Sequence, residues 1–280
     1  MTHATNNQYT HSHTVMSDGT IAFKCSTDEV KWPWLSLHPF NPITVQAINY
    51  WAASEAGAVR GTLDPDKWTA LTQTDWTCGK RGVGHATHGI ADPFREEGTP
   101  GYRLTFFDSS GSLVYRMRGT GVVFRTRDFE AWREKAKQDQ AVALPPTGEF
   151  QYAPARTLGV ATQDESFLSH LIEGKSASAD GLVTKELGFL PRHPYHGGSG
   201  DHVNSNQLAD IGHQFVHLLL GDAKFAVMGG EMKFNRYLEL DRPFNVELAG
   251  DGVSENTVSM IVRQVERQCA EVTIRYEIEE

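Results

Sequence analysis

A short motif that occurs twice constrains the fold of this chain most strongly. Residues 37–40 are Leu-His-Pro-Phe and precede an apolar, helix-like run from Ile43 to Ala58. Residues 192–195 are Arg-His-Pro-Tyr and precede a glycine-rich turn and a second such run, Ser205 to Leu220. The two histidines lie 155 positions apart in a chain of 280 residues. This spacing predicts two copies of one unit, with a histidine beside the start of each helix.

Composition restricts the class of protein. Hydrophobic residues make up 39% and charged residues 22% of the chain, which is ordinary for a soluble globular protein. No apolar run approaches the ~18 residues that a membrane span needs, so we expect no membrane partner. The net charge of −9 argues against nucleic acid as the main partner, because phosphate binding needs a basic surface. The three cysteines are widely spaced and odd in number, which favours a reduced, cytoplasmic protein without a disulfide framework.

A proline-rich stretch predicts the domain boundary. Leu144 to Gly148 holds two prolines and a glycine, and proline favours an extended linker. The polar, histidine-rich start has no apolar core of a signal peptide and is interpreted as a disordered tail. We therefore expect a tail at 1–17, a first domain at 18–140, a linker at 141–155 and a second domain at 156–280.

In each half the sequence predicts a short strand, the histidine motif, one long helix and then several long strands. Asp108 to Gly111 is a turn between two apolar runs and indicates a hairpin. The expected strands are Thr20 to Lys24, Tyr102 to Phe107, Leu113 to Arg125, Leu182 to Leu187, Gly229 to Glu239, Phe244 to Leu248, Thr257 to Gln264 and Ala270 to Glu277. This order resembles the hot-dog fold, in which a curved antiparallel sheet wraps a central helix. Two copies imply an α+β double hot dog.

The second half carries a carboxylate in an apolar helix. Asp210 lies among Leu208, Ala209 and Ile211, and a buried carboxylate is costly unless it is paired or neutral. It is therefore either a structural hydrogen bonder or an acid with an altered pKa. Gln214 shares its helix face.

The turn before that helix offers a second feature of the site. Asn204 or Ser205 can cap the helix, and the glycines before it permit a close approach of the backbone to a ligand. Free N–H groups at the helix start are expected to hold a thioester oxygen.

The first half carries His38 at the end of an expected apolar strand, directly before a helix. An imidazole titrates near neutral pH and can remove a proton α to a carbonyl. The alternative is a structural histidine that packs on Trp34 and bonds to the backbone.

Both halves resemble families of acyl-thioester enzymes. The segment from Trp34 to Gly57 resembles β-hydroxyacyl-ACP dehydratases, where a histidine precedes the central helix. Leu208 to Gln214 resembles the Asp-x-x-x-Gln/His motif of polyketide-synthase dehydratase domains. In that family the N-terminal hot dog supplies the catalytic histidine and the C-terminal one the aspartate, so the resemblance implies one site formed by His38 and Asp210. The Met-Pro-Gly that commonly opens the first helix is absent here.

Two further resemblances point to other reactions on the same fold. The order of His193-Pro-Tyr195, Asp201-His202-Val203 and Asp210 with Gln214 is similar to that of the A-factor biosynthesis hot-dog domain. His202-Val203-Asn204 is similar to the His-Val-Asn of acyl-ACP thioesterases. However, Gly198 and Gly200 stand where that family has its Asp and Asn.

The sequence therefore predicts a dehydratase of β-hydroxyacyl thioesters, carried by acyl carrier protein or CoA, in fatty-acid or polyketide-type biosynthesis. His38 would remove the α-proton, Asp210, held protonated, would protonate the leaving hydroxyl, and Gln214 would orient it. The alternatives are A-factor-type acyl transfer, thioester hydrolysis with Glu231, Glu239 or Asp201 as base, and a non-catalytic acyl-binding protein.

We expect no cofactor and no metal, and the sequence leaves a homodimer open. The expected substrate-binding residues are Trp34, Phe40, Gly200, His202 and Asn204.

Overall fold

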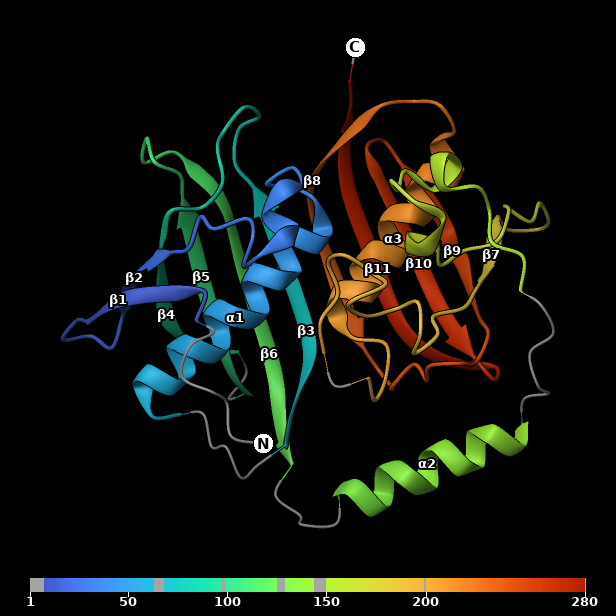
Figure 1. Ribbon diagram of the computed structural model, residues 1–280, viewed down its shortest axis with the longest axis horizontal. Helices are drawn as coiled ribbons and strands as arrows, with labels where there is room; N and C mark the ends of the chain where they lie inside the picture. Colours follow the sequence, from blue (N-terminus) through green and yellow to red (C-terminus); the bar gives the residue numbers. More distant parts are fainter. Residues whose placement is uncertain are drawn as a thin grey trace. The chain divides into compact units, whose positions relative to one another are not determined.

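The chain forms two compact units, residues 1–124 and 125–280. The computed structural model describes residues 8–62, 68–96, 99–124, 129–143, 150–198 and 200–279. Each unit contains a central helix and an antiparallel sheet (Figure 1). The predicted α+β architecture, with one long helix and several strands in each half, is confirmed.

Unit 1 is built around helix α1. Its sheet has the order β1-β2-β4-β5-β6-β3, with antiparallel neighbours throughout. The elements are β1 (Thr10–Val15), β2 (Ile21–Cys25), η1 (Pro33–Ser36), α1 (Pro42–Arg60), β3 (Trp68–Cys78), β4 (His88–Glu96), β5 (Thr99–Phe107) and β6 (Leu113–Phe124).

Unit 2 is built around helix α3. Its sheet has the order β8-β11-β10-β9-β7 and is also antiparallel. The elements are α2 (Phe129–Ala143), η2 (Ala155–Leu158), η3 (Gln163–Glu165), β7 (Ser178–Gly181), α3 (Ser205–Leu220), β8 (Phe225–Phe234), β9 (Phe244–Ser254), β10 (Thr257–Gln264) and β11 (Arg267–Ile278).

The two units share one topology. In unit 1, strands β2 to β6 pair in the order β2-β4-β5-β6-β3, and α1 connects β2 to β3. In unit 2 the order is β7-β9-β10-β11-β8, and α3 connects β7 to β8. The order of strands along the chain is therefore the same, and β1 is an additional edge strand of unit 1. The repeated sequence motif thus marks two structural copies.

Both central helices begin at an asparagine. The side chain of Asn41 accepts a hydrogen bond from the N–H of Ile43, and Pro42 follows at the first helical position. Asn204 accepts from the N–H groups of Asn206 and Gln207, and its own N–H donates to the Gln207 side chain at 2.9 Å. These caps fix where each helix begins relative to the histidine motif before it.

Helix α3 packs closely on its sheet. Gly212 lies opposite strand β11, where an added Cβ would come within 2.9 Å of the Val272 side chain. Leu208, Ile211 and Phe215 are buried on this helix together with Asp210, which is 1% exposed. The helix therefore carries its carboxylate into the interior of unit 2.

Two predictions for unit 1 need correction. The tail at 1–17 is not disordered over its whole length, because β1 pairs with β2 from Thr10 to Val15. The Glu55 side chain accepts hydrogen bonds from the N–H groups of Tyr9 and Thr10, which anchors this strand to α1. Residues 1–7 of the predicted tail lie outside the described part of the chain. The stretch before His38 is a 3₁₀ helix, η1, and not a strand.

One predicted strand of unit 2 is misplaced. The strand expected at Leu182 to Leu187 is a loop, and the edge strand is β7 at residues 178–181. Its sequence, Ser-Ala-Asp-Gly, lacks the apolar alternation that predicts a strand, but pairing with β9 holds it. Leu182 and Val183 are buried although they lie in a loop, so the apolar pattern there reflects burial and does not indicate a strand.

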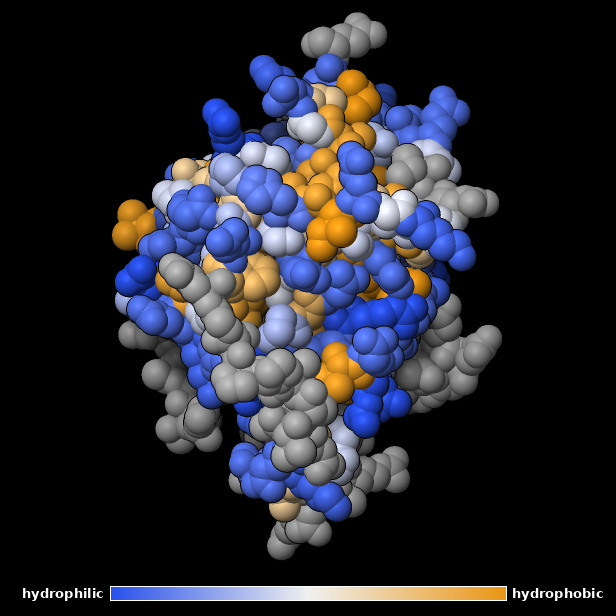
Figure 2. All heavy atoms as spheres, turned by 90° about the vertical axis from the view of Figure 1, so that its right-hand side faces the viewer, coloured by the Kyte–Doolittle hydropathy of each residue, from blue (hydrophilic) through white to orange (hydrophobic). Residues whose placement is uncertain are grey.

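The face drawn in Figure 2 carries hydrophobic residues in patches that hydrophilic residues interrupt. Large hydrophobic side chains that are exposed in unit 2 include Trp132, Ile172, Leu190 and Ile278. In the described part of the chain, none of the helices has the length and apolar character that crossing a membrane requires.

An ion-pair cluster fastens helix α2 to the rest of unit 2. The Arg133 guanidinium donates to both carboxylate oxygens of Glu239, at 2.7 and 3.0 Å, and to Asp201 at 3.0 Å. The side chains of Arg133 and Glu239 are 5% and 6% exposed. The Arg133 guanidinium also lies 4.2 Å from the centre of the Tyr237 ring, and Lys137 bonds to Asp201. A bidentate contact of this kind matches the geometry of guanidinium to that of carboxylate.

We expect Arg133→Met to lower the free energy of unfolding by about 3 kcal/mol or more, because Glu239 would remain buried without its charge partner. Urea denaturation of the purified protein measures this loss. The double variant Arg133→Met/Glu239→Leu should recover much of it, and Lys135→Met, an exposed position on the same helix, is the matched control. A single variant as stable as that control would contradict the account.

Candidate functional site

The two histidine motifs form the same turn in both units. The Nδ1 atom of His38 accepts a hydrogen bond from the N–H of Phe40 at 3.1 Å, and the Nδ1 atom of His193 accepts from the N–H of Tyr195 at 3.3 Å. Since a nitrogen that accepts carries no proton, the neutral form of each ring has its proton on Nε2. Each motif thus presents an Nε2–H group.

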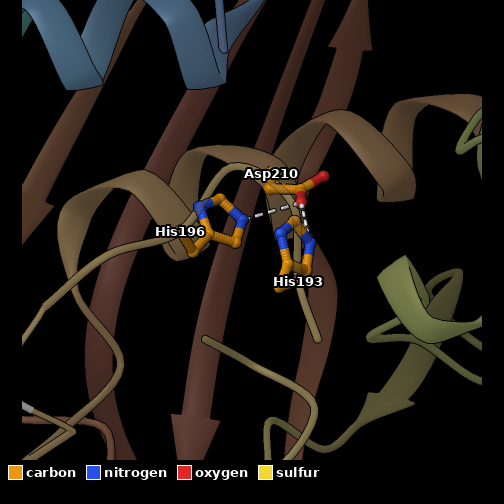
Figure 3. A group of neighbouring side chains, drawn as sticks. All are labelled: His193, His196 and Asp210. Carbon is orange, nitrogen blue, oxygen red and sulfur yellow. Dashed lines mark hydrogen bonds and ion pairs between the residues drawn. The ribbon is translucent and has the colours of Figure 1, made fainter. Parts of the chain in front are cut away.

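Three buried side chains meet in unit 2. Figure 3 shows His193 and His196, from the loop before α3, directed at Asp210 on the helix. The Nε2 atom of His196 lies 3.0 Å from Oδ2 of Asp210, and Nε2 of His193 lies 3.6 Å from the same oxygen. Both imidazoles are 0% exposed. Their rings stack with centroids 3.9 Å apart.

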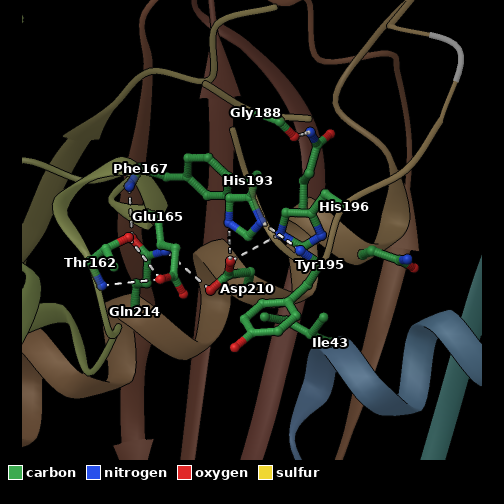
Figure 4. Close-up of polar contacts among 12 residues, drawn as sticks. Ile43, Thr162, Glu165, Phe167, Gly188, His193, Tyr195, His196, Asp210 and Gln214 are labelled. Atoms are coloured by element: carbon green, nitrogen blue, oxygen red, sulfur yellow. Dashed lines mark hydrogen bonds and ion pairs between the residues drawn. The ribbon is translucent and has the colours of Figure 1, made fainter. Parts of the chain in front are cut away.

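Gln214 holds the second oxygen of Asp210. Its Nε2 atom donates to Oδ1 of Asp210 at 3.1 Å and to the carbonyl of Glu165 at 2.9 Å (Figure 4). Its Oε1 atom accepts from the N–H of Phe167 at 2.9 Å. One amide therefore joins the carboxylate to the segment around η3. The contact with Asp210 is present, and the orienting role of Gln214 in a reaction stays a prediction.

The segment that Gln214 contacts is itself held by a local cap. The side chain of Glu165 accepts hydrogen bonds from the backbone N–H and the hydroxyl of Thr162, at 3.0 and 2.8 Å. This capping box closes the short η3 helix. The carbonyl of Glu165 and the N–H of Phe167 are thereby fixed where Gln214 meets them.

Electrostatics make Asp210 an anion. Burial raises the pKa of Asp210, but the contacts with His193 and His196 outweigh burial and hold this pKa well below its ordinary value. The prediction that apolar surroundings keep Asp210 protonated is therefore wrong. Burial lowers the pKa of His196 to about 4. The hydrogen bond to Asp210 acts in the opposite direction, because it favours the protonated imidazole. At neutral pH, Asp210 is therefore a carboxylate and His196 is a neutral imidazole.

The charges assign the tautomer of His196. An ionised carboxylate only accepts hydrogen bonds, so His196 donates its Nε2–H to Asp210 and Nδ1 keeps a lone pair. Among the described residues, this buried Nδ1 has no hydrogen-bond partner. The arrangement is that of an imidazole base oriented by a carboxylate. It can accept a proton from a carbon acid or from water.

The same three residues could be expected to hold a metal ion, since their ligand atoms all lie within 4.8 Å of one another. A histidine that binds a metal through Nε2 carries its proton on Nδ1. The N–H of Tyr195 points at Nδ1 of His193 and excludes a proton there. The hydrogen bonding thus fits a proton-transferring cluster better than a metal centre.

The predicted partner of Asp210, His38, belongs to unit 1 and has an exposed side chain. Its Nε2–H does not favour the predicted role of proton acceptor. That His38 and Asp210 share one site stays a prediction. Trp34 and Phe40, predicted to bind substrate, are 5% and 1% exposed in unit 1, where the Trp34 ring packs on Tyr9.

The remaining predicted binding residues lie in the loop before α3. Gly200 has a φ of 66°, which favours glycine, and Asn204 donates to the carbonyl of Gly197 at 3.1 Å. His202 contacts Asp201 at 3.1 Å and the Tyr237 ring.

The Asn204 side chain occupies N–H groups at the helix start, so the expected free oxyanion site is not formed there. Of the carboxylates proposed as bases for hydrolysis, Glu239 is paired with Arg133, and Asp201 is paired with Arg133 and Lys137.

Sequence reasoning did not single out His196 as a site residue and missed its bond to Asp210. The available signal was a second histidine three residues after His193, in the loop before a helix with a buried acid. Phe167 gave no signal, because it lies 43 positions before Asp210 in a loop and reaches the cluster through tertiary packing.

No protein family model matches the chain, and no curated protein matches its sequence. Solved structures do resemble it. An acyl-ACP thioesterase from Bacteroides thetaiotaomicron aligns with a TM-score of 0.56 at 11% identity, over 94% of this chain and 100% of that one. The dehydratase domain from the CurF module of curacin polyketide synthase aligns with a TM-score of 0.52 at 12% identity, over 98% of both chains. A 12:0-ACP thioesterase from Umbellularia californica aligns with a TM-score of 0.52 at 14% identity, over 85% and 90%.

These likenesses, together with the repeated topology, define the class of the protein. The chain has the double hot-dog fold, as the sequence predicted. Its neighbours of this fold include both polyketide-synthase dehydratase domains and acyl thioesterases. At this level of identity the likeness concerns the fold, and the reaction must be argued from the site.

The buried histidines predict how stability depends on pH. Burial lowers the pKa of His196 to about 4 and that of His217 to about 3, while an unfolded histidine titrates near 6.5. Between these values the unfolded chain binds more protons, so stability falls as the pH falls from 6.5 toward 4. The lowered pKa of Asp210 adds to this loss only below its ordinary value of 3.8.

We therefore expect the melting temperature to fall between pH 7 and pH 4.5, and to fall less in His217→Gln. Thermal denaturation followed by circular dichroism at four pH values tests this. An exposed histidine of the same unit provides the control His170→Gln, which should keep the wild-type slope. A melting temperature independent of pH over this window would contradict the buried, neutral histidines.

Proposed function

We propose that this chain is an acyl-thioester enzyme that dehydrates a β-hydroxyacyl thioester. The observation that carries the proposal is the buried Asp210 carboxylate, whose two oxygens are held by Gln214 and His196. A carboxylate fixed in this way orients an imidazole base, and its Asp-x-x-x-Gln spacing is the one that resembles dehydratase domains. The dehydratase and thioesterase neighbours support an acyl carrier protein or CoA thioester as substrate.

In the proposed reaction His196 is the base. Its Nδ1 atom takes the proton from the carbon α to the thioester carbonyl, and the electron pair of that C–H bond forms the α–β double bond. The β C–O bond breaks, and the hydroxyl leaves as water with the proton that the imidazolium returns. Asp210 stabilises the imidazolium between these steps, which is the usual role of a carboxylate beside a catalytic histidine.

His38 stays in the proposal as a residue that positions the substrate. Its Nδ1 accepts the Phe40 N–H, so the proposal has its Nε2–H donate a hydrogen bond to the β-hydroxyl, without transferring a proton, in place of the base predicted from sequence. The substrate-binding roles of Trp34, Phe40, Gly200, His202 and Asn204 stay proposals as well.

We expect Asp210→Asn and His196→Gln each to lower turnover of a β-hydroxyacyl thioester by about 10²–10⁴-fold, because each removes one half of the base. The assay follows the absorbance of the conjugated double bond, or its loss when an enoyl thioester is hydrated. His170→Gln, on the surface of the same unit, should leave turnover unchanged. Full activity in a folded Asp210→Asn or His196→Gln protein would contradict the proposal.

Thioester hydrolysis is the second candidate, and the ionised Asp210 favours it. A carboxylate–imidazole base can also accept a proton from water, and hydrolysis needs no protonated carboxylic acid. Release of free thiol from a saturated acyl thioester, measured with a thiol reagent, would identify hydrolysis. Formation of the double bond without free thiol identifies dehydration.

A further inference from the structure

A buried aromatic ring lies against both histidines of the cluster. The ring of Phe167 is nearly parallel to both imidazoles. Its plane makes an angle of 20° with that of His193, with ring centroids 5.4 Å apart, and an angle of 22° with that of His196, with centroids 5.9 Å apart. Phe167 is 1% exposed. Figure 4 shows its ring beside the imidazoles, on the segment that Gln214 holds.

The position of this ring is fixed by the backbone. The N–H of Phe167 donates to Gln214 at 2.9 Å, and its carbonyl accepts from the N–H of Leu182 at 2.9 Å. The amide that holds Asp210 therefore also holds Phe167. The Gln214 side chain thus connects the carboxylate that both imidazoles contact with the backbone of Phe167.

We propose that Phe167 is a positioning residue that stabilises the protonated form of His196 during the reaction. The inference rests on the proposed function, in which His196 takes up a proton inside a closed site. An aromatic face attracts a cation, most strongly where water is excluded. The ring also restricts the tilt of His196, so that Nε2 stays on Asp210 and Nδ1 stays available.

The groups that face His196 are few. Asp210 on α3 favours the imidazolium, while burial and the neighbouring His193 oppose it. The ring face of Phe167 therefore adds to the effect of Asp210. Its loss should make His196 a weaker base, by about tenfold in proton affinity.

The test replaces the ring by side chains that are apolar but have no aromatic face, Phe167→Leu and Phe167→Met. Phe215→Leu is the matched control, because Phe215 is 0% exposed on α3 and has no ring contact with either histidine among the described residues. Two readouts are combined. The first is the ¹³C chemical shift of His196 between pH 7.5 and 5, which reports the protonated fraction, and the second is the separation of kcat from KM.

We expect both Phe167 variants to reduce the protonated fraction of His196 at pH 5 about tenfold and to lower kcat by a similar factor, with KM nearly unchanged. Phe167→Tyr, which keeps an aromatic face, should restore most of the proton affinity. An unchanged protonated fraction in folded Phe167→Leu and Phe167→Met, or an equal change in Phe215→Leu, would overturn the inference. If the fraction changes as expected but the wild type processes no thioester, the positioning role stands and the proposed function fails.

Discussion

The buried carboxylate of Asp210, on helix α3, is the constraint on which the structure of unit 2 depends. Asp210 is buried on α3, on the side that the loop with His193 and His196 covers, where an isolated charge would cost several kcal/mol. Gln214 and His196 remove that cost by donating to its two oxygens, and His193 approaches the same carboxylate. The loop before α3 and the segment at η3 are both held in place by these bonds. The chemistry that we propose uses the arrangement that makes the buried charge tolerable.

Comparison of the two copies shows what this charge changes. Both units keep the histidine turn and an asparagine cap, but α1 has neutral amides in its core, with Asn49 donating to Gln46 at 3.2 Å. Unit 2 instead has a carboxylate and an additional histidine, His196, in a longer loop before its helix. Within the described part of the chain, the group of two histidines and a carboxylate on a central helix lies in unit 2.

The elements that the sequence predicts well are those with a strong local signal. Helix α3 has the predicted bounds, because an asparagine cap and a continuous apolar face define it. Strand β4 was missed because it contains Gly89 and Pro93, which argue against a strand. The pairing of β4 with β2 ends at Ala91. The missing N–H of Pro93 therefore removes no hydrogen bond between β4 and β2. Such tolerance depends on where the neighbouring strand ends, and a single sequence does not contain that information.

The site was predictable only in part for a similar reason. Asp210 and Gln214 lie four residues apart on one helix, so their contact follows from helical geometry. The protonation state of Asp210 depends on two histidines that a loop brings back onto the helix, and this made the predicted neutral acid an anion.

The central claim is tested most directly by the tautomer of His196 in the intact protein at neutral pH. Nitrogen-15 NMR distinguishes a protonated from an unprotonated ring nitrogen, and Asp210→Asn identifies the signal that depends on the carboxylate. The account predicts a proton on Nε2, shared with Asp210, and a free lone pair on Nδ1. A proton on Nδ1 with an unprotonated Nε2, or an Asp210 that is protonated at pH 7, would contradict it.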